Sequence, residues 1–280
     1  MKYSSLIFSA LILLNVVLWY GVVFGGPKPY LQTYFLNIGQ GDSTLTILPG
    51  GVKLLVDGGP DKSLLSELDR VLPANDRYID MVLLTHPQLD HFSGFISLLE
   101  RYKVGIFIWN GRPGDVEAWQ DLTNSLSEAK TPTIILSRND KINYKDSFIS
   151  ILSPDKELVK SSELNDTGIV AELFSSGIKE LFTADIGFVV EDILANLYDL
   201  NADILKVGHH GSKYSSGVGF LSEASPLVSV IQVGKNNYGH PTPDAINRLT
   251  QSGSSVYRND RDGRVNVVAL NGLLNVFKSK

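Results

Sequence analysis

The chain has 280 residues, 43% of them hydrophobic, and is long enough to bury the core of one large α/β domain. Its formal net charge is -5 at pH 7 and its pI is about 5.5, which argues against a protein that coats nucleic acid through bulk charge. Cysteine is absent, so disulfides and thiolate metal ligands are excluded. Any metal would be held by imidazole, carboxylate, amide or water.

The N-terminal segment is apolar, and the stretch from Leu6 to Phe24 carries no charged residue. As a helix it would nearly span the ~30 Å hydrocarbon layer of a membrane. We therefore expect residues 1–26 to form a membrane anchor, an uncleaved transmembrane helix, with the remaining domain (27–280) on the extracytoplasmic side. The alternative is a cleaved signal peptide, which would make the protein secreted, but no Ala-x-Ala pattern follows the apolar run.

Hydrophobic patterning after the linker predicts a mixed α/β domain with two similar halves. Two strands joined by a tight turn are expected within residues 33–48. Further strands are expected at 52–56, 80–84, 104–108, 133–136, 148–152, 169–174, 180–183, 204–207 and 228–233. Helices are expected at 64–72, 92–101, 116–129, 189–198 and 243–250. A hairpin over residues 265–277, turning at Asn271-Gly272, closes the domain.

The most informative stretch is residues 84–94, where a hydrophobic strand ends directly in His86, Asp90 and His91. Loops at strand ends often carry catalytic groups, and imidazole together with carboxylate suits zinc or manganese. Either histidine alone could be a surface or capping residue. Because both occur beside Asp90, the segment favours a metal site.

The pattern His86-x-x-x-Asp90-His91 resembles the metallo-β-lactamase superfamily motif. Asp57, the loop at 165–166, Asp185 and the segment 209–212 resemble the family's remaining positions, in order. Segments 35–43, 205–212 and 238–241 are most similar to the hydrolase domain that ends ComEC-type competence DNA-uptake proteins. The resemblance extends from residue 31 to the C-terminus. It implies a four-layer αββα sandwich, with the metals at one edge of the two sheets.

The resemblance also implies a ligand set. Asp90, His91 and His210 would bind one metal, Asp185 would bridge toward a second, and His86 would belong to that second site. We therefore expect one or two zinc or manganese ions per chain.

The sequence departs from the family pattern at Gln88, a ligand position where the superfamily usually has histidine. A neutral amide is a poor ligand. The site containing His86 could then bind metal weakly, remain empty, or recruit Asp166 from the facing loop. Gln88 therefore leaves open whether one or two metals bind.

Several residues are expected to support the metal ligands or to contact the substrate. Asp57 would accept a hydrogen bond from a ligating histidine, although a turn residue before two glycines is a competing interpretation. His209 is expected either to support the centre or to contact the substrate. His240, in a loop bounded by glycine and proline, could hold a phosphate or an oxyanion, and the alternative is a turn residue. Asp90 and His240 are the candidate catalytic residues.

Other polar residues carry weaker signals. The segment Gly39–Asp42 is interpreted as a tight turn packed near the metal edge, because a phosphate-binding loop would need a following helix. Six basic residues could form a rim for a phosphodiester, but scattered solvated charges are the favoured interpretation. These six are Lys206, Lys213, Lys235, Arg258, Arg261 and Arg264.

The expected function is that of a metal-dependent hydrolase, a phosphodiesterase or nuclease acting on single-stranded DNA or another phosphodiester. Bound metal lowers the pKa of water from 15.7 toward ~7, so attack by metal-bound hydroxide is the expected step. A hydrolase of small esters, lactones or thioesters is one alternative. A degenerate module that binds metal or nucleic acid, in which Gln88 has ended catalysis, is another. Any DNA channel would have to be a separate partner protein, because only one anchor is expected.

Overall fold

The computed structural model describes residues 2–24, 26–270 and 272–280. The first part of the chain contains α1 (Lys2–Phe24), β1 (Leu31–Phe35), β2 (Thr44–Ile47), β3 (Lys53–Val56), α2 (Ser63–Val71), β4 (Tyr78–Leu83), α3 (Leu89–Arg101), β5 (Lys103–Trp109), α4 (Glu117–Glu128) and β6 (Thr133–Ile135). The second part contains β7 (Lys141–Tyr144), β8 (Ser147–Ser153), η1 (Leu158–Lys160), η2 (Leu164–Thr167), β9 (Val170–Ser175), β10 (Ile178–Phe182), α5 (Phe188–Leu197), β11 (Ile204–Lys206), η3 (Gly208–Gly211), α6 (Val218–Ala224), β12 (Val228–Ile231), α7 (Pro243–Gln251), β13 (Ser255–Arg258), α8 (Asn259–Asp262), β14 (Val265–Leu270) and β15 (Leu273–Lys278).

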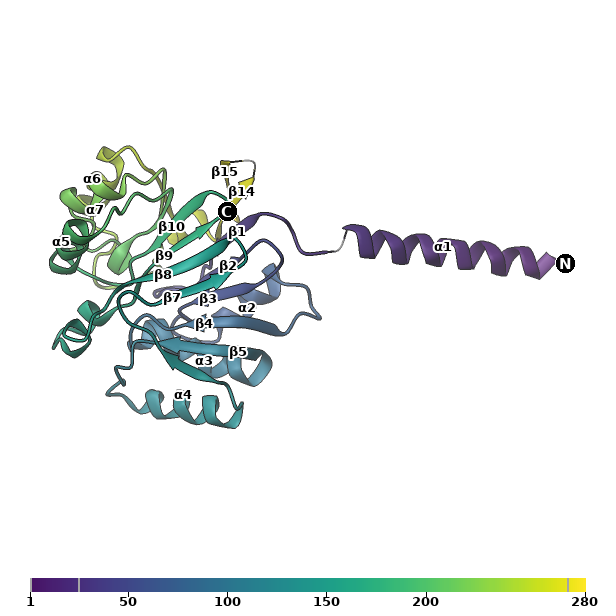
Figure 1. Cartoon of the computed structure of the whole chain (residues 1–280), viewed down its shortest axis with the longest axis horizontal. Helices are drawn as coiled ribbons and strands as arrows, with labels where there is room; N and C mark the ends of the chain where they lie inside the picture. The colour runs from purple at the N-terminus through teal and green to yellow at the C-terminus, as the bar shows by residue number, and fades with distance from the viewer. Residues whose placement is uncertain (1, 25, 271) are drawn as a thin grey trace.

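Two sheets pack face to face, with helices on both outer faces (Figure 1). The first sheet has the order β15-β14-β1-β2-β3-β4-β5-β6, and the second has the order β13-β12-β11-β10-β9-β8-β7. Helices α2, α3 and α4 cover the first sheet, and α5, α6 and α7 cover the second. The expected αββα sandwich is therefore confirmed. Each half of the chain forms most of one sheet, and the last hairpin returns to the first sheet.

Side-chain alternation along the strands produces the layers. On β3, Leu54 and Val56 join the apolar cluster between the sheets, while Leu55 joins the cluster beneath the helices. On α3, Phe92, Phe95 and Leu98 recur at helical spacing and are buried against the first sheet. The sandwich therefore has three apolar interfaces, one between the sheets and one under each helical layer.

One edge of the sandwich collects polar residues because parallel strands from both sheets end there. Strands β3, β4 and β5 run parallel in the first sheet, and β10, β11 and β12 run parallel in the second. The residues that follow β3, β4, β10 and β12 are therefore brought to a common edge, where α/β proteins commonly bind ligands. The turn before β2 closes on the same edge. Gly41 there has φ +142°, and an added Cβ would overlap the Asp90 carbonyl oxygen.

The N-terminal helix α1 projects away from the sandwich (Figure 1). Within residues 2–24, 26–270 and 272–280, no helix is both long and apolar enough to cross a membrane. The transmembrane helix expected over Leu6 to Phe24 is therefore not supported.

Two further differences from the expected elements have local reasons. Helix α3 begins at Leu89 rather than at the expected Phe92. The earlier start was not predicted, because the first turn is partly exposed and carries no apolar spacing. Strands β7 and β13 and helix α6 were not expected, since each is short and the two strands are at most half-buried. The expected hairpin is formed by β14 and β15, and Asn271 in its turn lies outside the described residues.

Candidate metal centre

His91 lies in the first turn of α3 and is fully buried. Its Nδ1 is 2.9 Å from Oδ2 of Asp57, whose other oxygen accepts a hydrogen bond from the Thr85 backbone N–H at 2.8 Å. Its Nε2 has no hydrogen-bond partner among the described residues and lies 3.4 Å from Asp185 Oδ2 and 3.9 Å from Asp90 Oδ2. An imidazole oriented by a carboxylate on one nitrogen, with the other free, has the arrangement of a metal ligand.

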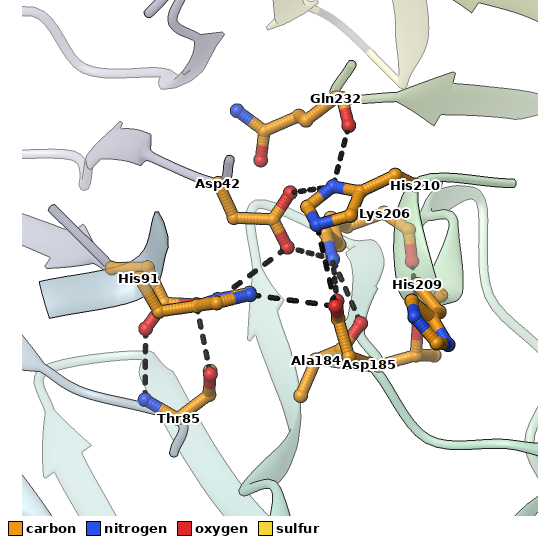
Figure 2. A network of polar contacts seen from close by, with 12 residues as sticks. Asp42, Thr85, His91, Ala184, Asp185, Lys206, His209, His210 and Gln232 are labelled. Carbon is orange, nitrogen blue, oxygen red and sulfur yellow. Dashed lines mark hydrogen bonds and ion pairs between the residues drawn. The ribbon is translucent and has the colours of Figure 1, made fainter. Parts of the chain in front are cut away.

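His210, within η3 on the side of the second sheet, faces Asp185 (Figure 2). Its Nδ1 lies 2.9 Å from the carbonyl oxygen of Gln232 and donates to it. Its Nε2 lies 3.2 Å from Asp90 Oδ2 and 3.3 Å from Asp185 Oδ2. The Nε2 atoms of His210 and His91 are therefore both directed at the space between Asp90 and Asp185.

Carboxylates make the electrostatic potential around His91 and His210 strongly negative. Burial acts to lower the pKa of His91 and of His210, but Asp185 and the neighbouring carboxylates outweigh burial. They raise the pKa of His91 well above its usual range and that of His210 to about 10. Without metal, both imidazoles therefore carry protons that a divalent cation would replace.

His86 has a different environment. It is buried, and its Nδ1 and Nε2 lie 2.9 Å from Thr85 Oγ1 and 3.1 Å from Gln88 Oε1. Burial, together with the charge of His91, lowers the pKa of His86 to about 3. Its ring is therefore neutral at physiological pH.

The donor atoms fit a divalent metal. The ligand atoms of Asp90, His91 and His210 lie within 4.8 Å of one another, and so do those of His86, His91 and Asp185. Imidazole and carboxylate donors of this kind suit zinc or manganese, and the fold implies that a divalent metal binds here. The structure thus brings together His86, Asp90, His91, Asp185 and His210, the residues that the sequence singled out.

A buried ion pair beneath this cluster was missed by the sequence analysis. The Lys206 ammonium contacts the Asp42 carboxylate, donates to the Ala184 carbonyl oxygen at 2.8 Å and lies 3.4 Å from Asp185 Oδ1 (Figure 2). The expectation of Lys206 as a solvated charge or part of a basic rim is therefore wrong. A lysine inside the short buried strand β11 was the available signal, because lysine is almost never fully buried without a partner.

The backbone is strained at several positions around the centre. His209 and His210 have φ values of 48° and 52°, Asp57 has 59°, and Ala184, before Asp185, has 47°. Left-handed backbone at residues other than glycine costs on the order of 1 kcal/mol or more each and is concentrated at functional sites. The fold therefore stabilises these residues in backbone conformations that they would rarely adopt on their own.

A cleft of about 550 Å³ opens above the cluster. Its walls include Gln88, Asp90, Asn165, His209 and His240. Within the described part of the chain, Asp166 belongs neither to this lining nor to a group that could hold a metal. The neighbouring Asn165 reaches the cleft instead, with its side-chain nitrogen 3.4 Å from the His209 ring.

Among the described residues that line the cleft there is no lysine or arginine. Three of the six basic residues considered above, Arg258, Arg261 and Arg264, form ion pairs with acidic side chains. The cleft therefore has no cationic rim, and its lining combines neutral side-chain donors with the carboxylates of Asp90, Asp115 and Asp185.

Aromatic rings lead from the buried centre to the surface. The His209 ring lies 6.2 Å from that of His210 and 5.4 Å from that of His240, and the Tyr238 ring lies 5.9 Å from His240. Burial lowers the pKa of both His209 and His240. Tyr238 is 75% exposed at the mouth of the cleft. The ring series thus gives the cleft one wall capable of stacking.

The sequence and the fold of this chain are similar to those of known proteins. Residues 53–244, more than half of the chain, match the model of the beta-lactamase superfamily domain. ComE operon protein 3 of Bacillus subtilis strain 168 is 29% identical over 253 residues, which cover 82% of this chain and 32% of that protein. Recombination protein 2 of Haemophilus influenzae is 27% identical over 246 residues, which cover 86% of this chain and 29% of that protein. The chain thus spans about a third of the length of these relatives.

The fold also resembles a solved structure, that of the metallo-beta-lactamase fold protein YhfI from Bacillus subtilis. The TM-score is 0.57 at 18% sequence identity, and the match covers 82% of this chain and 96% of YhfI. At this identity the match supports the fold alone.

Proposed function

Since this chain belongs to the beta-lactamase superfamily and resembles ComEC-type competence proteins, we propose that it is a metal-dependent phosphodiesterase acting on single-stranded DNA. The observation that carries the proposal is the convergence of Asp90, His91 and His210 on one point at the base of the cleft. A bound zinc or manganese ion would act there as a Lewis acid and lower the pKa of water. The names of two relatives, Recombination protein 2 and the competence protein ComA of Neisseria gonorrhoeae, support DNA as the substrate.

The cleft residues have distinct proposed roles in this reaction. The Asp90 side chain is 33% exposed, so its carboxylate reaches the cleft while contacting His210. It can orient an incoming water and accept its proton. His240 is half-buried in the cleft wall beside His209, where its imidazole can hold a phosphate oxygen by a hydrogen bond. His209 and His240 are neutral donors, because burial lowers the pKa of both. We therefore propose that the site binds one phosphodiester group rather than a long run of phosphates.

A second candidate is a hydrolase of small esters, lactones or thioesters. It is favoured by the lack of lysine and arginine among the described cleft-lining residues and by the apolar side chains of Leu89, Val116 and Leu164 in the lining. A site of that composition suits an uncharged ester at least as well as a polyanion. Substrate choice therefore separates the two candidates.

The test is hydrolysis by the purified full chain, stripped with a chelator and reloaded with zinc or manganese. The substrates are end-labelled single-stranded DNA, methyl p-nitrophenyl phosphate and a panel of lactones and thioesters. We expect phosphodiester cleavage that falls at least a hundredfold in Asp90→Asn and in His91→Ala. Asp115→Asn is the matched control, because this carboxylate lines the cleft outside the ligand groups. Activity that persists in both cluster variants, or turnover of the lactone and thioester panel alone, would rule the proposal out.

A further inference from the structure

We infer that this centre binds one metal ion per chain, and that the Gln88 side chain occupies the place a second ion would need. The inference rests on the proposed metal-dependent function and specifies its metal stoichiometry. It begins with His91, which belongs to both of the candidate donor groups that do not include Asp42. Its Nδ1 is committed to Asp57 at 2.9 Å, so only Nε2 is free to bind a metal. One nitrogen lone pair binds one ion, and the two groups therefore compete for it.

The two groups have the same donor types, but the His86 Nε2 atom already contacts the Gln88 amide at 3.1 Å, so His91 is assigned to the group with Asp90 and His210. With His91 assigned there, the other group is reduced to His86 and Asp185. Protein zinc sites normally use at least three protein ligands, so two are too few for a stable second site.

The two remaining candidate groups both depend on Asp42. The Lys206 ammonium already contacts that carboxylate, and the His210 Nδ1 lies 3.2 Å from its other oxygen. A divalent cation at Asp42 would have to displace an internal cation that is itself buried. These groups therefore do not provide a second site.

The position of Gln88 supports the same conclusion. Gln88 is the N-cap residue of α3, yet its side chain makes no capping hydrogen bond. Its amide lies instead 3.1 Å from His86 Nε2. The side chain that could have capped the helix is thus directed at the atom that would otherwise bind a second metal.

The hydrogen bonds around Thr85 define the protonation of His86. Thr85 Oγ1 donates its only hydrogen to Asp57 Oδ2 at 2.8 Å, so its 2.9 Å contact with His86 Nδ1 must be a hydrogen bond donated by His86. His86 Nε2 then carries a lone pair. An acceptor nitrogen at Nε2 needs a donor, so the network assigns the Gln88 NH₂ group to the amide position 3.1 Å away, exchanged with Oε1, because the two amide atoms have nearly the same shape. A second ion would have to break this bond and would gain only two ligands.

The experiment counts metal per chain. The full chain is stripped with a chelator, dialysed against zinc or manganese and measured by elemental analysis, with calorimetry of metal alone for affinity. We expect one equivalent in the wild type and in Gln88→Ala. In His86→Ala we expect one equivalent with its affinity unchanged within about twofold. In Gln88→His, or in Gln88→Asp should the first variant fold poorly, we expect two equivalents, because a third donor then joins His86 and Asp185. His240→Ala serves as the control for zinc held by the His209–His240 pair.

Two equivalents in both the wild type and His240→Ala would overturn the inference, and so would loss of the single equivalent in His86→Ala. A Gln88→His chain and a Gln88→Asp chain that melt like the wild type but still bind one ion would overturn the role of Gln88. Failure of the proposed function has a different signature. One equivalent of metal without phosphodiester hydrolysis would contradict the proposed function but agree with the inferred stoichiometry. Two equivalents with hydrolysis would agree with the function and contradict the stoichiometry.

Discussion

Glu180 on β10 accepts a hydrogen bond of 2.8 Å from Oγ1 of Thr33 on β1, so a carboxyl and a hydroxyl join the two sheets inside the sandwich. Both side chains are fully buried, and the second carboxyl oxygen has no hydrogen-bond partner among the described residues. Burial raises the pKa of Glu180 to about 8, and the bond from Thr33 offsets only part of that rise. The carboxyl is therefore protonated in the folded chain at neutral pH.

This proton makes stability depend on pH. Between the ordinary glutamate pKa of 4.5 and about 8, the folded chain keeps a proton on Glu180 that the unfolded chain has lost. Its contribution to the free energy of unfolding is therefore fully present below pH 4.5 and is lost as pH rises through about 8. We expect the urea midpoint to depend less on pH across this range in Glu180→Gln than in the wild type. The exposed Glu128→Gln should keep the wild-type dependence, and equal slopes in all three chains would refute the assignment.

Lys206 should stabilise the metal-free centre by offsetting the charges of Asp42 and Asp185. Removing one partner of a buried ion pair costs about 3–5 kcal/mol, because the remaining charge is left uncompensated. We expect Lys206→Met to lower the unfolding temperature of the metal-free chain. Added zinc should then raise it by more than it does in the wild type, because the metal replaces the lost positive charge.

The matched control is Lys53→Met. Lys53 forms a 2.7 Å ion pair with Asp76 at the opposite end of β3 from the metal centre, and its side chain is 11% exposed. This variant should lose stability but show the wild-type response to zinc. A zinc response of the same size in Lys206→Met as in Lys53→Met would show that Lys206 has no part in the charge balance of the centre.

Asp57 should matter for metal affinity although it lies behind the ligands. It fixes the His91 ring through Nδ1 and is itself held by Thr85. Loss of such a supporting carboxylate typically weakens metal binding 10–100-fold. We expect Asp57→Asn to do so in competition with a chelating dye. The control is Asp80→Asn, which removes a carboxylate that accepts a hydrogen bond from the Lys53 backbone N–H and should leave the metal affinity unchanged. Wild-type metal affinity in Asp57→Asn would show that Asp57 does not support the ligands.

The parts of the centre predicted from the sequence lie in continuous segments. His86, Asp90 and His91 follow one buried strand, so a local pattern was enough to single them out. The pairing of Asp42 with Lys206 joins the β1–β2 turn of the first sheet to β11 of the second. No periodicity within either segment contains that information, because the contact exists only once the sheets pack together.

The same limit applies to the fold. Long strands with alternating burial and helices with a clear apolar stripe were predicted close to their bounds. Strands β7 and β13 were missed, because the apolar residues of such short edge strands are too few to establish a period. The side chain of Gln88 was recognised as a departure from the family pattern, but its contact with His86 required the three-dimensional structure.

Tyr238 should discriminate between single-stranded DNA and simple phosphodiesters. It lies at the exposed end of the ring series that leads to His210, where an unstacked base could rest on it. Stacking of a base on an aromatic side chain contributes about 1–3 kcal/mol, so Tyr238→Ala should weaken binding of a short single strand about tenfold or more, while Tyr238→Phe should not. Fluorescence anisotropy of a labelled oligonucleotide measures this, and hydrolysis of methyl p-nitrophenyl phosphate should change little, because that substrate carries no base. Tyr214→Ala is the control, since Tyr214 is 63% exposed but does not line the cleft. Equal losses in Tyr238→Ala and Tyr214→Ala would mean that the ring series does not guide the strand.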